Sequence, residues 1–264
     1  MAASIQPAGV PVEIATRIPI SVVIAARNEA ANIVGCIDSL GWADEVLVAD
    51  HGSTDETPRL AQRAGAIVLV DADAATIGAL RNAAIAGARN EWVLVVDADE
   101  CGTPQLAGTI VATIAAPRHE AYRIRRRNFF MGGEIRHGGW ERDRPVRLFR
   151  RSLRYDDSLV HEHVVTSGAV GDLDAALLHY PYASMKQYFE KFARYSEWWA
   201  VDQARRGRRA SAAAVVLKPP ARFVSMYLFR LGLLDGRRGA VLAALAAASV
   251  MAKYARLWAL TCES

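Results

Sequence analysis

The sequence contains few cysteines, and they follow no pattern. Cys36, Cys101 and Cys262 are the three cysteines in 264 residues, and no two of them have C-x-x-C spacing. Disulfide-stapled secreted proteins and zinc ribbons both need paired cysteines. Both classes are therefore excluded, and we expect the protein to work in a reducing compartment.

A secretory signal and a long apolar run are also lacking. The first basic residue is Arg17, and Glu13 precedes it, so the chain does not start with a basic region followed by an apolar segment. The most apolar late stretch, Gly239 to Ala252, is shorter than the roughly 20 residues of a membrane-spanning helix. We expect a cytoplasmic protein without a transmembrane helix.

Charge is distributed unevenly along the chain. Residues 1–185 hold 18 Lys/Arg against 23 Asp/Glu, whereas residues 186–264 hold 14 against 5. A basic region of this kind favours an anionic partner, such as a membrane or a phosphorylated lipid. Residues 1–17 contain Pro7, Gly9 and Pro11 without periodicity and are expected to form a flexible N-terminal arm.

Apolar runs of strand length alternate with helical patterns over the first part of the chain. Ile18 to Ala26 is a continuous apolar run, typical of a strand that is buried on both faces. The further strands are expected at 45–49, 66–70 and 92–96, and helices at 29–40, 76–88 and 104–115, with another helix starting near Asp55. This alternation predicts an α/β fold with a mainly parallel sheet and helices on both faces.

The alternation stops after residue 115. Residues 118–154 contain twelve arginines against four acidic residues and indicate short strands and loops. Helical periodicity returns at Ser184, and we expect Pro219-Pro220 and Gly236 to divide this region into three helices. The sequence therefore predicts a sheet domain over 18–183 and a basic helical region over 184–264.

Three polar clusters follow predicted strands, at residues 27–29, 50–53 and 97–100. Ligands of open α/β sheets bind beyond the carboxyl ends of the strands, so these clusters are expected to converge. Asp97 and Asp99 carry oxygens suited to Mg²⁺ or Mn²⁺. Asp50, with Gly52 beside it, can accept hydrogen bonds from a base or a ribose. The alternative for both motifs is a turn or a helix cap.

Taken as an ordered set, these motifs resemble a known family. Val23-Ile24-x-x-Arg27-Asn28-Glu29, Asp50-x-Gly52-Ser53-Thr54-Asp55-x-Thr57, Gly78-x-x-Arg81-Asn82 and Asp97-Ala98-Asp99-Glu100 are similar to the family-2 glycosyltransferases. Later segments resemble the branch that glycosylates the lipopolysaccharide inner core: 126–128, 138–140, 147–151, 160–162 and 234–239.

The resemblance implies a GT-A fold and an inverting, single-displacement transfer from a nucleoside-diphosphate sugar, expected to be a UDP-sugar. Residues 18–105 would bind the donor and 106–183 the acceptor, a glycan or a lipid-linked saccharide. By the same resemblance Asp97 lies near the ribose and Asp99 binds the metal. The other positions matched to nucleotide-sugar binding are Arg27, Glu29, Asp50, Gly52 and Arg81.

Inverting transfer needs a base for the acceptor hydroxyl, and a carboxylate is the usual choice. We favour Glu162, which lies in His161-Glu162-His163, with Asp143 as the alternative. His163 is a candidate to complete the metal shell or to tune the carboxylate. The alternative is that these are ordinary surface residues.

Candidate phosphate or acceptor contacts lie in the arginine-rich region. Arg144 and Arg147 are near Trp140, and a guanidinium group binds phosphate through two parallel hydrogen bonds. Trp140 can stack on a sugar ring or fill a core position. Basic segments beside apolar runs in the C-terminal region indicate peripheral contact with an anionic membrane, on the inner face of the cytoplasmic membrane.

Two other functions compete with sugar transfer. A sugar-nucleotide nucleotidyltransferase can use the same kind of sheet, but such enzymes carry a Gly-rich loop after the first strand, and residues 25–29 contain no glycine. A basic nucleic-acid-binding module is supported only by the charge of the C-terminal region and the sequence pI near 9.1. No known nucleic-acid-binding motif is present, so nucleic acid is not expected as a partner.

Overall fold

The computed structural model describes residues 17–158, 162–182 and 184–262. The flexible arm expected at 1–17 lies outside the described residues except for Arg17. The chain forms two compact units. We call residues 17–127 with 143–180 the sheet unit, and residues 128–142 with 181–262 the helical unit. The border between donor-binding and acceptor-binding parts stays a prediction.

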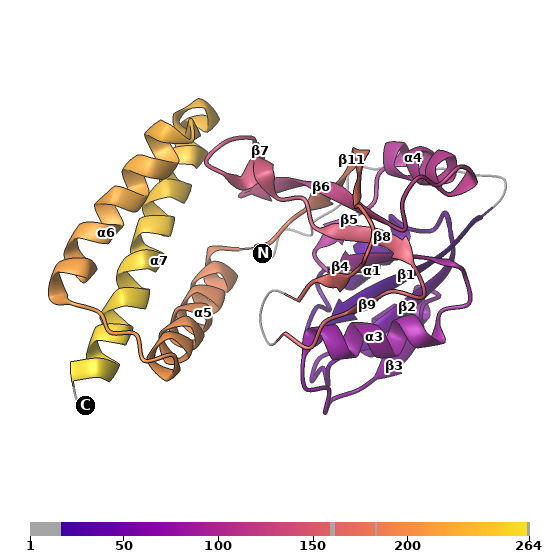
Figure 1. Cartoon of the computed structure of the whole chain (residues 1–264), viewed down its shortest axis with the longest axis horizontal. Helices are drawn as coiled ribbons and strands as arrows, with labels where there is room; N and C mark the ends of the chain where they lie inside the picture. The colour runs from indigo at the N-terminus through magenta and orange to yellow at the C-terminus, as the bar shows by residue number, and fades with distance from the viewer. Residues whose placement is uncertain (1–16, 159–161, 183, 263–264) are drawn as a thin grey trace. The chain divides into compact units, whose positions relative to one another are not determined.

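The sheet begins with four parallel strands and continues with antiparallel ones (Figure 1). The parallel strands, in spatial order, are β3 (Ile67–Val70), β2 (Ala43–Asp50), β1 (Ile18–Ala26) and β4 (Trp92–Asp97). The strands that follow are β8 (Val146–Arg150), β6 (Ala121–Phe130), β11 (Gly171–His179) and β5 (Glu100–Cys101), with β7 (Gly133–Ile135) on β6. A separate pair joins β9 (Arg154–Tyr155) to β10 (Val164–Val165). The predicted α/β class is confirmed.

Helices cover both faces of the parallel part. Successive side chains of β1 point to opposite faces: Val22 and Ile24 enter one buried cluster, and Val23 enters the other. The first cluster is completed by α1 (Ile33–Asp38), α2 (Thr57–Arg63) and α4 (Pro104–Ala115), and the second by α3 (Ile77–Gly87). Burial on both faces explains why β1 is a continuous apolar run.

The C-terminal helices differ from the prediction at the Pro219-Pro220 pair. The three long helices are α5 (Met185–Arg205), α6 (Ala212–Val224) and α7 (Gly236–Cys262). Both prolines lie inside α6 and do not end it. Each proline removes one backbone donor, but packing of α6 along α7 keeps the segment helical.

The apolar helix is longer than the sequence pattern suggested. The helical stretch Gly232–Cys262 has 31 residues, whereas the apolar stretch noted in the sequence ended at Ala252. Beyond Ala252 the helix packs on α5, where Lys253 lies 5.8 Å from the centre of the Trp199 ring and Arg256 lies 3.4 Å from Glu197. Among the described residues it is the one helix that is long and apolar enough to cross a membrane, by length and composition alone.

The helical unit has a core of its own. Phe130 and Ile135, from β6 and β7, pack with Tyr188 of α5 and Leu242 of α7. Met226, in the π-helical turn Ser225–Phe229 that follows α6, completes this core. The strands at 128–135 are therefore held by the C-terminal helices.

Candidate functional site

Two carboxylates flank the end of β1. Asp50 pairs with Ala26 on one side and Asp97 pairs with Ala25 on the other. Parallel strands end at the same edge of a sheet, so the clusters that follow β1, β2 and β4 are brought together there. This edge is the candidate active site.

The loops after β1 and β2 hold each other through polar contacts. Asp50 is 1% exposed and accepts from the backbone N–H of Ser53 at 2.8 Å. The hydroxyl of Ser53 in turn accepts from the N–H of Asn28, whose side chain accepts from the N–H of Thr54 at 2.8 Å. Asn28 has a left-handed backbone with φ 57°, a conformation that asparagine tolerates. Asp50 therefore organises the loop as well as lining the edge.

The neighbouring donor-site candidates have different surroundings. Glu29 is half-buried; its N–H donates to the Thr57 hydroxyl, and its carboxylate accepts from Asn32 at 2.7 Å. Arg27 is exposed. Gly52 has φ 66°, and a Cβ there would lie 2.9 Å from the Cβ of Ala72. Glycine is thus required at position 52 for both backbone and space.

Hydrogen bonds to neighbouring residues hold the turn after β4 in place. Glu100 is fully buried, and its carboxylate accepts from the N–H of Asp97 at 2.8 Å. The carbonyl of Asp99 accepts from the N–H of Tyr180 at 2.8 Å. These two bonds hold Asp97 and Asp99 at the strand end.

Three arginines converge on Asp97. Arg81 binds one carboxylate oxygen at 2.5 Å, and Arg126 and Arg147 bind the other, each at 2.5 Å. Burial acts to raise the pKa of Asp97, but the three guanidinium groups outweigh it and hold that pKa well below its usual range. Arg147 also reaches the buried Glu100 at 3.1 Å. Asp97 is therefore ionised.

Helix α3 aligns Arg81 with the segment around β9. Asn82, the next residue, donates to the Tyr155 carbonyl at 3.0 Å and accepts from its N–H at 2.9 Å. A Cβ on Gly78, one turn earlier, would lie 3.0 Å from the Asp156 carbonyl and 3.4 Å from the Cβ of Glu162. The glycine permits this close approach.

Each candidate base is linked to Asp97 through an arginine of its own. Glu162 forms an ion pair with Arg81, and its side chain is 17% exposed. Asp143 lies 3.1 Å from Arg126 and is 40% exposed. His161 lies outside the described residues.

Asp99 has a histidine neighbour that sequence reasoning missed. His179 Nε2 lies 3.5 Å from an Asp99 carboxylate oxygen, because β11 pairs with β5 and sets His179 opposite Glu100. His163, the histidine proposed from the sequence, is exposed, and its N–H donates to Asp156 at 3.2 Å. Within the described ranges, no three His, Cys, Asp or Glu side chains form a metal-binding group.

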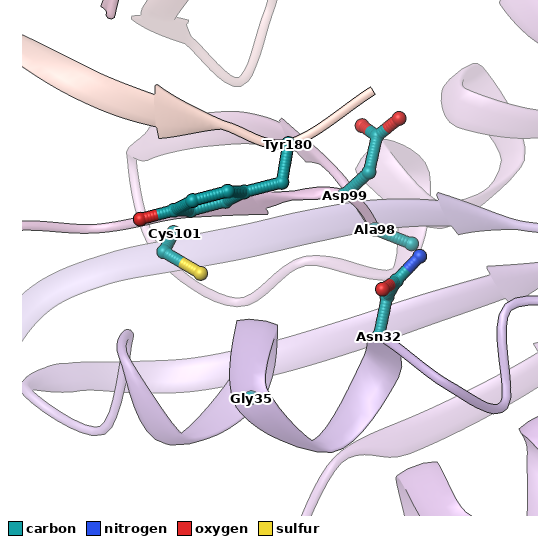
Figure 2. A pocket seen from close by; sticks show the side chains of 6 residues that line it. All are labelled: Asn32, Gly35, Ala98, Asp99, Cys101 and Tyr180. Atoms are coloured by element: carbon teal, nitrogen blue, oxygen red, sulfur yellow. The ribbon is translucent and has the colours of Figure 1, made fainter. Parts of the chain in front are cut away.

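A small pocket lies beside Asp99 (Figure 2). The Asp99 carboxylate points away from the thiol of Cys101, and the ring of Tyr180 lies over that thiol. Burial raises the pKa of Cys101 to about 11, so its thiol is neutral near pH 7. The Cys101 thiol therefore lacks the thiolate character of a reactive cysteine. The pocket is lined by Asn32, Gly35, Ala98, Asp99, Cys101 and Tyr180.

The candidate acceptor contacts have three different environments. Arg147 is buried at 3% side-chain exposure and engages Asp97 and Glu100, whereas Arg144 is exposed. Trp140 is partly buried and packs against the core of the helical unit. Its position agrees with the core-filling alternative, and its role toward an acceptor stays a prediction.

Two solved structures match part of the chain. A glucosyl-3-phosphoglycerate synthase from Mycobacterium tuberculosis, in complex with Mn²⁺, UDP-glucose and phosphoglyceric acid, is 27% identical with a TM-score of 0.36, covering 43% of this chain and 45% of that one. A mannosyl-3-phosphoglycerate synthase from Rubrobacter xylanophilus is 28% identical with a TM-score of 0.38, covering 42% and 41%. The chain thus spans less than half of the length of these proteins.

Sequence relatives match over much more of the chain. A lipopolysaccharide core biosynthesis glycosyltransferase of Rhizobium meliloti is 31% identical over 90% of this chain and 94% of its own length. An uncharacterised glycosyltransferase of Rickettsia typhi is 29% identical, covering 73% and 70%. Residues 21–170 match the family described as glycosyl transferase family 2. The α/β sheet with carboxylates at its strand ends and these matches together show that the chain belongs to glycosyl transferase family 2, as an enzyme of the GT-A fold class.

Proposed function

We propose that this enzyme moves a sugar from a nucleoside-diphosphate sugar, a UDP-sugar, to a saccharide of the lipopolysaccharide core or another envelope glycan, with inversion at the anomeric carbon. One observation carries the proposal: Asp50 and Asp97 flank the end of β1, at the edge where α/β sheets bind nucleotides. Similarity to a lipopolysaccharide core glycosyltransferase over 90% of the chain supports the acceptor class.

The donor's nucleoside would lie against the loops after β1 and β2. Asp50 and Glu29 offer carboxylate oxygens, Gly52 leaves room for a close approach, and Arg27 is exposed beside them. Asp97 would accept from the ribose. These contacts bind and orient the donor.

The donor's diphosphate would lie near the arginines that contact Asp97. Within the described part of the chain, the Nε–H groups of Arg81 and Arg147 are buried without a hydrogen-bond partner. Buried donors left in this way fit an anionic ligand, because phosphate oxygens accept strongly from guanidinium. Arg81 and Arg126 can stabilise charge on the diphosphate as it leaves.

The residues at Asp99 fit a divalent cation. The Asp99 carboxylate suits Mn²⁺ or Mg²⁺, and the His179 imidazole 3.5 Å away offers a nitrogen ligand that Mn²⁺ accepts more readily than Mg²⁺. Mg²⁺ usually keeps waters and completes its shell with substrate phosphates. Asp99 and His179 would hold the cation. Asp97 would contribute less to its binding, because the Asp97 carboxylate is already paired with arginines. When bound, the cation neutralises charge on the diphosphate.

Glu162 would take the proton of the acceptor hydroxyl. As that oxygen bonds to the anomeric carbon, the bond from this carbon to the diphosphate oxygen breaks, and the electron pair leaves with the diphosphate. Glu162 is better shielded from water than Asp143, at 17% against 40% exposure. Arg81, which bridges Glu162 and Asp97, would position the base beside the donor.

The acceptor would be held at a membrane. Lipopolysaccharide core is built on a lipid, so an enzyme acting on it works on the cytoplasmic face, and the excess of basic residues after residue 185 suits that surface. Arg144 and Trp140 are our candidates for acceptor phosphate and sugar contacts.

Product analysis tests this function. The purified chain is incubated with Mn²⁺, a panel of UDP-sugars and a deacylated lipopolysaccharide core, and the released nucleotide and the new linkage are identified. We expect UDP release and an inverted anomeric centre. Release of pyrophosphate would indicate the nucleotidyltransferase alternative, and retention of configuration would exclude the single-displacement step.

A further inference from the structure

Large apolar side chains are concentrated at the turn between α6 and α7. We call residues 228–234 the apolar turn. Phe229 is 81% exposed, and Leu234 is 59% exposed. Exposed apolar patches of this kind mark interaction sites rather than ordinary surface. The other exposed members are Leu228, Leu231 and Leu233.

The apolar turn is held rigidly. Leu231 has a left-handed backbone with φ 57°, which is rare for leucine and persists only where the surroundings enforce it. The backbone at Gly232 packs directly against the backbone at Gly239, since a Cβ on Gly239 would lie 1.8 Å from the Gly232 carbonyl. The Arg230 carbonyl accepts from the N–H of Gly138 at 2.8 Å. The leucines are therefore presented to solvent by a fixed backbone.

Asp235 ties the turn to the segment after β7. Its carboxylate is 5% exposed and accepts from the N–H groups of Arg136 and His137, at 3.1 and 2.9 Å. It also lies 3.1 Å from the His137 ring. Figure 1 shows β7 beside this end of α6 and α7. The segment that leads to Trp140 is thus fixed to the apolar turn.

Basic residues lie within the apolar turn and directly after it. Arg230, Arg237 and Arg238 are exposed. The one acidic residue of 228–238 is Asp235, whose carboxylate is already engaged. Apolar side chains beside exposed arginines match the interface of an anionic bilayer, where lipid phosphates meet acyl chains. A second copy of the same chain would instead bring these cations together.

We infer that the apolar turn inserts into the headgroup region of an anionic bilayer, with Phe229 and Leu234 in the acyl boundary and Arg230 and Arg237 on lipid phosphates. The inference deepens the proposed function, on which its purpose rests: the segment from β7 to Trp140 would meet a lipid-linked acceptor at headgroup depth. Lipid binding needs neither donor nor acceptor, so an experiment can contradict membrane docking without contradicting sugar transfer, and the reverse.

Vesicle flotation of the full chain tests the inference. The vesicles contain phosphatidylcholine alone or with phosphatidylglycerol, and the variants are Phe229→Ser/Leu234→Ser and the matched control Ile67→Ser/Val70→Ser, whose side chains on β3 are 55% and 61% exposed. We expect binding to the anionic vesicles only, reversed by high salt. Burial of an apolar side chain strengthens binding by about 10-fold or more, so the turn variant should bind at least about 10-fold more weakly, and the control should bind as the unaltered chain does.

Two outcomes would overturn the inference. Equal vesicle binding by the turn variant and the unaltered chain would show that another surface docks. If the unaltered chain does not bind vesicles but forms a dimer, and the turn variant is monomeric, the turn would be the contact with a second copy of the chain. UDP release with a water-soluble acceptor should be unchanged in the turn variant, which separates docking from catalysis.

A further measurement distinguishes insertion at the interface from spanning by α7. Cys262, near the end of α7, is exposed, whereas Cys36 and Cys101 are buried. In sealed spheroplasts an impermeant maleimide should label Cys262 only after lysis. Labelling before lysis would show that α7 crosses the membrane and would overturn interfacial docking.

Discussion

The carboxylate of Glu100 accepts a hydrogen bond from the backbone N–H of Asp97 at 2.8 Å. Glu100 thereby closes the turn that presents Asp97, and its other oxygen engages Arg126 and Arg147. The last residue of Asp97-Ala98-Asp99-Glu100 is thus a positioning residue, buried below the edge at which the substrate would bind.

Replacing Glu100 by glutamine tests this positioning role. The amide oxygen can still accept from the Asp97 N–H, but the charge that offsets the buried Arg147 is lost. We expect the free energy of unfolding to fall by about 3 kcal/mol, as for other broken buried ion pairs. UDP release should also become slower. Urea denaturation and kcat are measured beside Glu190→Gln, a control residue with 64% side-chain exposure. Stability and kcat equal to the control would remove the assigned role.

Glycine at position 78 is predicted to be needed for geometry. Gly78→Ala places a methyl group 3.0 Å from the Asp156 carbonyl and 3.4 Å from the Cβ of Glu162, so the Glu162 segment must move by a few tenths of an ångström. Since misplacement by about 1 Å can cost on the order of 100-fold in rate, we expect kcat to fall while the fold persists.

Gly108→Ala is the matched control, because nothing lies within 4 Å of a Cβ at that position in α4. It should raise the melting temperature, since alanine is favoured over glycine in a helix by about 1 kcal/mol, and should leave kcat unchanged. Equal kcat in the two variants would contradict the packing argument.

The depressed pKa of Asp97 makes stability depend on pH in one direction. A carboxyl group whose pKa is lower in the folded chain stabilises it above the unfolded pKa, near 3.9, and this stabilisation is lost as pH falls toward the folded value. We expect Asp97→Asn to lower the free energy of unfolding by about 3 kcal/mol at pH 7. This difference from the unaltered chain should become smaller below about pH 4.

Urea denaturation from pH 7 to pH 3 measures this gap. Asp174→Asn, at an exposed position of β11, is the control and should show little difference at any pH. A gap for Asp97→Asn that stays constant down to pH 3 would mean that its charge does not contribute to stability.

The two candidate bases give different kinetic signatures. Glu162→Gln should lower kcat by about 100-fold or more, the usual contribution of general base catalysis, while UDP affinity stays within about twofold because the donor contacts remain. Asp143→Asn should have a smaller effect, since Asp143 is more exposed. A larger loss in Asp143→Asn would transfer the base role to that residue.

Much of the parallel part of the sheet could be predicted from the sequence. The apolar runs of β1 and β4 locate those strands, and parallel pairing then brings Asp50 and Asp97 to one edge. These inferences need only local patterns and the rule that ligands bind beyond the carboxyl ends of parallel strands.

Contacts between distant antiparallel strands could not be predicted in this way. His179 reaches Asp99 through the pairing of β11 with β5, and Arg147 reaches Asp97 from β8, which pairs with β4. No local pattern specifies those registers, so the sequence suggested His163 as a metal ligand beside Asp97 and Asp99, and placed Arg147 as a phosphate or acceptor contact without its pairing to Asp97. The continuation of α6 through Pro219 is likewise set by packing against α7.

Calorimetry of UDP binding, with and without Mn²⁺, tests the account most directly. The unaltered chain should bind UDP more tightly with Mn²⁺, and Asp99→Asn and His179→Gln should each lose about 10-fold or more of that gain, whereas His163→Gln should keep it. If a chain with both Asp97→Ala and Asp99→Ala retains Mn²⁺-assisted UDP affinity and turnover, the proposed metal-assisted donor site is wrong.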